Sequence, residues 1–286
     1  WLSAPKGTAR FFGDPTEIQK NYLVKDFKSD VGQLPVTQSV HVQVGAAPDE
    51  HIKEIAWIQS QIDSRSLSKV KLPSAIVAYA DLESDNIIET LDNIQATKSV
   101  RGIRQIVGRE PREDEQTGSA KLLTDKNWLF GLQELQKRSL SFDLQLIPSQ
   151  MNSAFDVFSL VKDLPVALCH CGSPWFLKSQ YRSSQSYGIW KDGITKLASL
   201  PNVYCKVSGL SMFTQQWNIK DISFIFETIL ETFGIERCMF GSNFPVDKLH
   251  IDYQSIWKTY MFLTEKLKIT DRKKLFADNC RQFYKL

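Results

Sequence analysis

The sequence predicts an α/β fold of the TIM (β/α)8 barrel type, on three observations. Segments typical of strands alternate with segments typical of helices, at a spacing of roughly 20–35 residues that suits parallel strands with crossover helices. At least three of the strands have polar side chains on one face and apolar side chains on the other, whereas an open doubly wound sheet has strands that are mostly apolar on both faces. In a barrel, the apolar row lies under the helices and polar groups near the C-terminal mouth line a site. A length of 286 residues also fits one barrel of roughly 250 residues.

Seven strands can be placed on the sequence, one fewer than the eight of this barrel. We therefore expect a barrel whose first strand is missing from the residues given. Residues 1–38 hold glycine and proline among polar residues, which predicts an irregular leading segment with a short helix near Pro15–Asn21, within a single domain of residues 1–286. The strands are expected at 39–45, 75–81, 101–107, 141–147, 166–170, 201–209 and 237–243.

Composition and motifs exclude several classes of function. The net charge of +3 comes from nearly balanced acids and bases without a long basic run, which indicates no nucleic-acid partner. No apolar run is long enough to cross a bilayer, so no membrane partner is expected. The five cysteines are an odd number without C-x-x-C spacing, which predicts a reduced, cytoplasmic protein. Phosphate-binding glycine loops, Gly-x-Ser-x-Gly elbows and HExxH helices do not occur, so nucleotide chemistry and serine hydrolysis have no support.

The stretch VALCHCGSP at 166–174 predicts a buried strand that ends at His170, whose imidazole can titrate, just before a loop. His170 can polarise a carbonyl, protonate a leaving group or bind a metal. The alternative is a hydrogen-bonded core histidine, and the position at a strand end favours a functional role. Cys169 and Cys171 are expected to face away from His170 on a strand, so the three cannot hold one metal ion together.

Other predicted strands also end in polar side chains. Arg104 shares strand parity with Gly102 and is expected to point into the barrel; the alternative is a structural ion pair, with Asp81 or Asp143. Trp175 lies in a loop after a strand and is a candidate wall for a ring-shaped substrate, although such aromatic residues often only pack the loops. The further candidates for substrate binding are Gln43, Lys206 and Ser208.

Six motifs in this order resemble the amidohydrolase-2 branch of the amidohydrolase superfamily. The resemblance runs from Trp1 to the end of the chain, and the nearest group is the predicted metal-dependent hydrolases that include L-fuconolactonase and 2-pyrone-4,6-dicarboxylate lactonase. Two features depart from the family. Its first strand, with a His-x-His pair, is absent, and Asn243 stands where the family usually has aspartate. The motifs are HVQV (41–44), RGIR (101–104), HCGSP (170–174), PNVYCKVSG (201–209), RCMFGSNFPVD (237–247) and NCRQFY (279–284).

The resemblance implies hydrolysis of a lactone of a sugar acid or a dicarboxylate, and thus a small-molecule carboxylate or lactone as the substrate. Arg104 would help to hold a substrate carboxylate, and His170 would stabilise the oxyanion. Asn243 replaces a carboxylate that activates water; an amide is a poor base and a weak metal ligand, but it can orient a water molecule or a substrate oxygen. Asp247 is a replacement base if its loop turns inward. A turn role for Asn243 and simple solvation of Asp247 are the alternatives.

The resemblance leaves the cofactor and the reaction open. A divalent metal such as zinc would need ligands upstream of Trp1, because His170 is the one good metal ligand in the chain. A decarboxylase of an unsaturated or aromatic acid is the second reading, against which Asn243 counts. A catalytically inactive binding barrel is the third reading, and homo-oligomer formation is open under all three.

Overall fold

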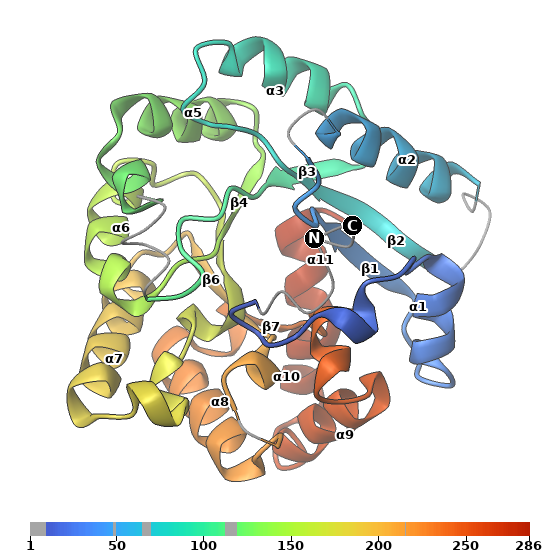
Figure 1. The fold of residues 1–286 in the computed structure, drawn as a ribbon, viewed down its shortest axis with the longest axis vertical. Helices are drawn as coiled ribbons and strands as arrows, with labels where there is room; N and C mark the ends of the chain where they lie inside the picture. The colour runs from blue at the N-terminus through green and yellow to red at the C-terminus, as the bar shows by residue number, and fades with distance from the viewer. Residues whose placement is uncertain (1–9, 48–49, 65–69, 112–118, 215) are drawn as a thin grey trace.

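The computed structural model describes residues 10–47, 50–64, 70–111, 119–214 and 216–286. Its strands form one curled, parallel sheet with helices around the outside (Figure 1). The α/β class and the alternation of strands with helices agree with the prediction.

The described residues form seven strands that lie in the sheet in sequence order. Each strand is parallel to its neighbour, and no pairing joins the outer strands β1 and β7. The sheet therefore has the strand order of a barrel but stays open between two edges, and no eighth strand closes it within the part of the chain that the structure describes. The strands are β1 Gln38–Val42, β2 Lys71–Ala78, β3 Val100–Ile103, β4 Ser141–Leu144, β5 Val166–Leu168, β6 Val203–Val207 and β7 Cys238–Phe240.

The helix α5 shows how a sequence signal sets the start of an outer helix. In α5, the Asp125 side chain accepts hydrogen bonds from the N–H groups of Asn127 and Trp128, and the apolar stripe that follows is buried. Within the described ranges, no helix has the length and the apolar character that a membrane span requires. The helices are α1 Val24–Val31, α2 His51–Asp63, α3 Ile87–Gln95, α5 Lys126–Lys137, α6 Met151–Phe158, α7 Ser184–Ala198, α8 Ile219–Phe233, α9 Tyr253–Leu263, α10 Ile269–Lys273 and α11 Asn279–Tyr284.

The leading segment is more regular than predicted. A 3-10 turn covers Thr16–Ile18, close to the expected short helix, but α1 was not predicted. The Asp26 carboxylate accepts a hydrogen bond from the N–H of Leu23, 2.8 Å away, and Phe27 packs edge-on against Tyr253 of α9. This long-range contact stabilises a helix that is too short to be stable by itself.

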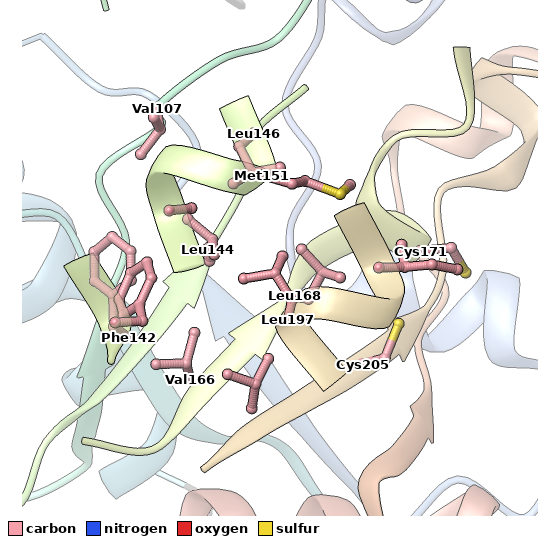
Figure 2. Packing of buried hydrophobic residues seen from close by; sticks show 14 of the residues in the cluster. Val107, Phe142, Leu144, Leu146, Met151, Val166, Leu168, Cys171, Leu197 and Cys205 are labelled. Carbon is pink, nitrogen blue, oxygen red and sulfur yellow. The ribbon is translucent and has the colours of Figure 1, made fainter. Parts of the chain in front are cut away.

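The outer face of the sheet packs against the surrounding helices. Phe142 and Leu144 of β4 and Val166 and Leu168 of β5 are fully buried and belong to one apolar cluster with Leu197 of α7 (Figure 2). β4 alternates as predicted, with its apolar residues under the helices. β5 is apolar and buried on both faces, since Ala167 belongs to the inner cluster of the sheet.

The inner face of the sheet packs against the end of the chain. Phe283 and Tyr284 of α11 form a small cluster with the inward-facing residues Val77, Ala167 and Met239. Figure 1 shows α11 inside the curl of the sheet. The C-terminal helix thus fills space that the side chains of the strands leave open.

β1 is oriented opposite to the prediction. Val40 and Val42 pack against the inner cluster, whereas His41 faces outward and its Nε2 lies 2.8 Å from the Glu54 carboxylate of α2. The expected apolar row under the helices is therefore wrong for β1. At an outer strand next to an apolar inner cluster, burial inside the curl outweighs burial under one helix.

Candidate active site

A cavity of about 1630 Å³ lies between the edges of β1 and β7 and reaches the C-terminal mouth of the sheet. The volume exceeds the range of about 300–1,000 Å³ that is typical of a small-molecule site. At the mouth, the cavity brings together side chains from separate strand ends, as expected for parallel strands. These polar mouth residues are Gln43, Arg104, Gln145, His170, Lys206, Ser208 and Asn243.

His170 lies in a tight turn rather than on the strand, because β5 ends at Leu168. His170 and Cys171 both have a φ of 53°, in the left-handed region. The ring Nδ1 lies 3.0 Å from the Ser208 hydroxyl. Burial lowers the pKa of His170 to about 3, with help from the charges of Lys206 and Arg104. The imidazole is therefore neutral at physiological pH.

Lys206 is held by an internal ion pair. Its ammonium lies 2.5 Å from the carboxylate of Asp143, which is fully buried on the inner face of β4. The hydroxyl of Tyr284 donates to the same carboxylate, at 2.9 and 3.1 Å from its two oxygens. The charge of Lys206 is thus compensated within the protein, by one of the two acids that the sequence offered as partners for Arg104.

Arg104 has no such compensation. The guanidinium donates to the backbone oxygen of Gln43 and to Oε1 of Gln145, 3.4 Å away, while its buried Nε has no hydrogen-bond partner. No carboxylate of the described residues pairs with it, and burial lowers its pKa. Arg104 is a partly buried cation on the cavity wall whose buried Nε has no partner, and such a group favours an anionic ligand.

Asn243 and Asp247 form a pair at the end of β7. Asn243 lines the cavity, and its Nδ2 donates to Oδ1 of Asp247, 2.9 Å away. Asp247 is fully buried behind Asn243 and does not line the cavity. Burial raises the pKa of Asp247 to about 7, although its contacts with Asn243 and Ser211 act in the opposite direction.

Trp175 does not join the other site candidates. It is 3% exposed, packs against the rings of Phe11, Tyr181 and Phe213, and does not line the cavity. Its position corresponds to the alternative of loop packing that the sequence left open.

Two residues next to the site were not predicted. Gln145 lies on the polar row of the alternating segment 141–147, and that alternation is a signal that could have found it. Tyr284 comes from α11, and no periodicity of the sequence indicates that a C-terminal helix reaches Asp143.

The described residues do not by themselves fit a metal centre. Among them, no group of three or more histidine, cysteine, aspartate or glutamate side chains is arranged to hold an ion. Two imidazoles line the cavity, of which His41 is paired with Glu54 and His170 has the positive charges of Lys206 and Arg104 beside it. A zinc ion normally needs three or four protein ligands, so further ligands would have to come from elsewhere.

The Amidohydrolase family model matches residues 75–286. This chain belongs to the amidohydrolase family. An uncharacterized protein of Sinorhizobium fredii is 33% identical over all of this amidohydrolase and 93% of its own length. The L-fucono-1,5-lactonase of Burkholderia multivorans is 26% identical, over the whole of this chain and 90% of the relative.

Solved structures share the fold of this amidohydrolase at low sequence identity. An amidohydrolase from Burkholderia multivorans with bound HEPES matches with a TM-score of 0.82 and 21% identity, over 98% of this chain and 96% of the other; a second structure has bound zinc. A probable 2-pyrone-4,6-dicarboxylic acid hydrolase from Acinetobacter baumannii has a TM-score of 0.70 at 15% identity, covering 98% and 93%. A 2,6-dihydroxybenzoate decarboxylase from Rhizobium has a TM-score of 0.62 at 14% identity, covering 99% and 93%.

Proposed function

We propose that this amidohydrolase hydrolyses a lactone, the cyclic C–O ester of a sugar acid or of a dicarboxylate. The observation that carries the proposal is the partly buried Arg104, which forms no ion pair among the described residues and lies on the same cavity wall as the neutral His170. The similarity to an L-fucono-1,5-lactonase supports the lactone as the substrate class.

In the proposed reaction, a water molecule adds to the lactone carbonyl carbon and the ring C–O bond breaks. The proton that the water releases ends on the departing ring oxygen, which becomes a hydroxyl group. Arg104 binds the substrate carboxylate or the oxyanion that forms on the carbonyl oxygen. In the tautomer that we propose for His170, Nδ1 accepts from the Ser208 hydroxyl 3.0 Å away, and the protonated Nε2 polarises the carbonyl. Asn243 orients the attacking water.

The test is a screen of sugar-acid lactones and unsaturated dicarboxylate lactones, with acid release followed by a pH indicator. We expect turnover by the wild-type protein and its loss in His170→Ala. A wild-type protein that binds lactones without releasing acid would instead support an inactive binding barrel. The presence of Asn243 in place of the family's aspartate favours this alternative.

A decarboxylase is the second candidate, because a 2,6-dihydroxybenzoate decarboxylase shares the fold. Its substrate would also present a carboxylate to Arg104. The same screen separates the two reactions when aromatic carboxylates are included, because a decarboxylase releases carbon dioxide and a lactonase releases acid.

We propose that any zinc ion in this site takes its remaining ligands from residues ahead of Trp1. The described residues contain no group of three or more histidine, cysteine, aspartate or glutamate side chains that could hold an ion. Zinc supplies Lewis-acid polarisation of a carbonyl when it is bound. Metal analysis of the purified 286 residues is expected to find no stoichiometric zinc, and finding it would contradict this assignment. The cytoplasmic location and the homo-oligomeric state stay predictions.

A further inference from the structure

We propose that Asp247 is a positioning residue that fixes the orientation of the Asn243 amide, so that the amide carbonyl oxygen faces the cavity as an acceptor for the attacking water. This role rests on the proposed hydrolysis and adds to it a residue that does not touch the substrate. Asp247 acts through Asn243 because Asn243 lines the cavity and Asp247 lies behind it.

The first step of the argument is the chemistry of the contact between the two side chains. An ionised carboxylate can only accept hydrogen bonds, so the NH2 group of Asn243 must face Asp247 across the 2.9 Å contact. The same nitrogen lies 3.6 Å from the sulfur of Met212. Both hydrogens of the NH2 group therefore have partners inside the protein, the Asp247 carboxylate and the Met212 sulfur. The carbonyl oxygen Oδ1 of Asn243 has no donor among the described residues and is free to accept from a water molecule.

The second step is the rigidity of the pair. The backbone N–H of Asp247 donates to the backbone carbonyl oxygen of Asn243, 3.2 Å away. The backbone carbonyl oxygen of Asp247 accepts from the N–H groups of His250 and Ile251, both at 2.9 Å. The pair is thus tied together through the backbone as well as through the side chains. Asn243 has a φ of 52°, a conformation that asparagine tolerates better than most residues.

The third step is the surroundings of the carboxylate. The groups that face Asp247 are the amide of Asn243, the hydroxyl of Ser211 on the turn Leu210–Met212 and the phenol of Tyr260 on α9, and no basic side chain of the described residues is among them. The second carboxylate oxygen, Oδ2, is buried without a hydrogen-bond partner. Burial therefore raises the pKa of Asp247 to about 7, so that the carboxyl group titrates near neutral pH.

Protonation would reverse the contact. A carboxylic acid can donate its O–H to the carbonyl oxygen of Asn243, which turns the amide so that its NH2 group faces the cavity. An NH2 group cannot accept a hydrogen bond from water. The amide then no longer orients the nucleophile, and turnover falls on the acid side of the pKa of Asp247.

The experiment compares pH profiles of kcat and KM for lactone hydrolysis by the wild type, Asp247→Asn and Asn243→Ala. The wild type is expected to lose kcat below about pH 7, the value of the Asp247 pKa. In Asp247→Asn, an amide that can either accept or donate replaces the acceptor-only carboxylate, so the orientation of Asn243 is no longer fixed. We expect kcat to fall about five- to tenfold, the factor that corresponds to one hydrogen bond, with KM unchanged and no acid limb. In an Asn243→Ala background, Asp247→Asn should have no further effect on kcat. Asp92→Asn removes an exposed carboxylate of α3 and serves as the matched control.

A nuclear magnetic resonance titration makes the test independent of turnover. The side-chain amide signals of Asn243 should move with a midpoint near pH 7 in the wild type and stay constant in Asp247→Asn. Wild-type protein without turnover of any lactone would refute the proposed hydrolysis, while the titration would still decide the orientation of the amide. Asn243 signals that do not titrate, or an Asp247→Asn variant with the wild-type kcat and acid limb, would overturn the positioning role.

Discussion

The two cations of the cavity mouth, Lys206 and Arg104, differ in how their charge is compensated. Lys206 has a complete internal environment, in which Asp143 supplies the opposite charge and Tyr284 donates a further hydrogen bond to that acid. Arg104 has two amide partners, one backbone and one side chain, and an unsatisfied Nε. This difference indicates that Lys206 stabilises the fold, whereas Arg104 is available to bind an anionic ligand. Variants of each residue should therefore affect different properties.

The largest expected effect is on stability, in Lys206→Met. The substitution leaves Asp143 as a buried acid without its cation, and we expect the free energy of unfolding to fall by about 3–5 kcal/mol. Urea denaturation followed by circular dichroism measures it. Adding Asp143→Asn to Lys206→Met should restore part of the loss, and a fully stable single variant would remove the distinction between the two cations.

A second effect on stability comes from the raised pKa of Asp247. The unfolded chain loses this proton near pH 3.8 and the folded protein near pH 7, so between these values the folded state holds a proton that the unfolded state has lost. Stability should therefore fall as pH rises through this range, by about 4 kcal/mol in total. Asp247→Asn should abolish this contribution and be more stable than the wild type at pH 8. Equal pH dependence in both proteins would contradict the assignment.

Arg104→Met should show the opposite pattern to Lys206→Met. We expect the rate of lactone turnover to fall on the order of a hundredfold, which corresponds to a loss of about 3 kcal/mol of transition-state stabilisation. The free energy of unfolding should change little. Arg104 forms no ion pair among the described residues, so its removal leaves no acid without a direct cationic partner. A strongly destabilised Arg104→Met protein would show that an acidic partner of Arg104 exists in solution.

The smallest effect is expected for Tyr284→Phe, which removes one hydrogen bond to Asp143 and keeps the aromatic ring. The free energy of unfolding should fall by about 1 kcal/mol, with unchanged lactone turnover. A large loss of turnover would instead show that the ion pair of Lys206 and Asp143 takes part in the reaction.

Alternation along the strands predicted much of this arrangement. Lys206 and Ser208 share one face of their strand as expected, and the parity of Arg104 with Gly102 placed it at the cavity. The same alternation was misleading at β1, since it defines two faces without indicating which one turns inward. The turn at His170 and the approach of Tyr284 depend on left-handed backbone and on a long-range helix contact, which local patterns do not contain.

The central claim is that His170 and Arg104 together act on a lactone carbonyl. The most direct measurement is acid release from a panel of lactones by the wild type, His170→Ala and Arg104→Met at pH 8, with folding of each variant checked by circular dichroism. We predict turnover by the wild type and its loss by a hundredfold or more, on the order expected for an oxyanion donor, in both variants. Unchanged turnover in His170→Ala, or acid release by none of the three proteins, would contradict it.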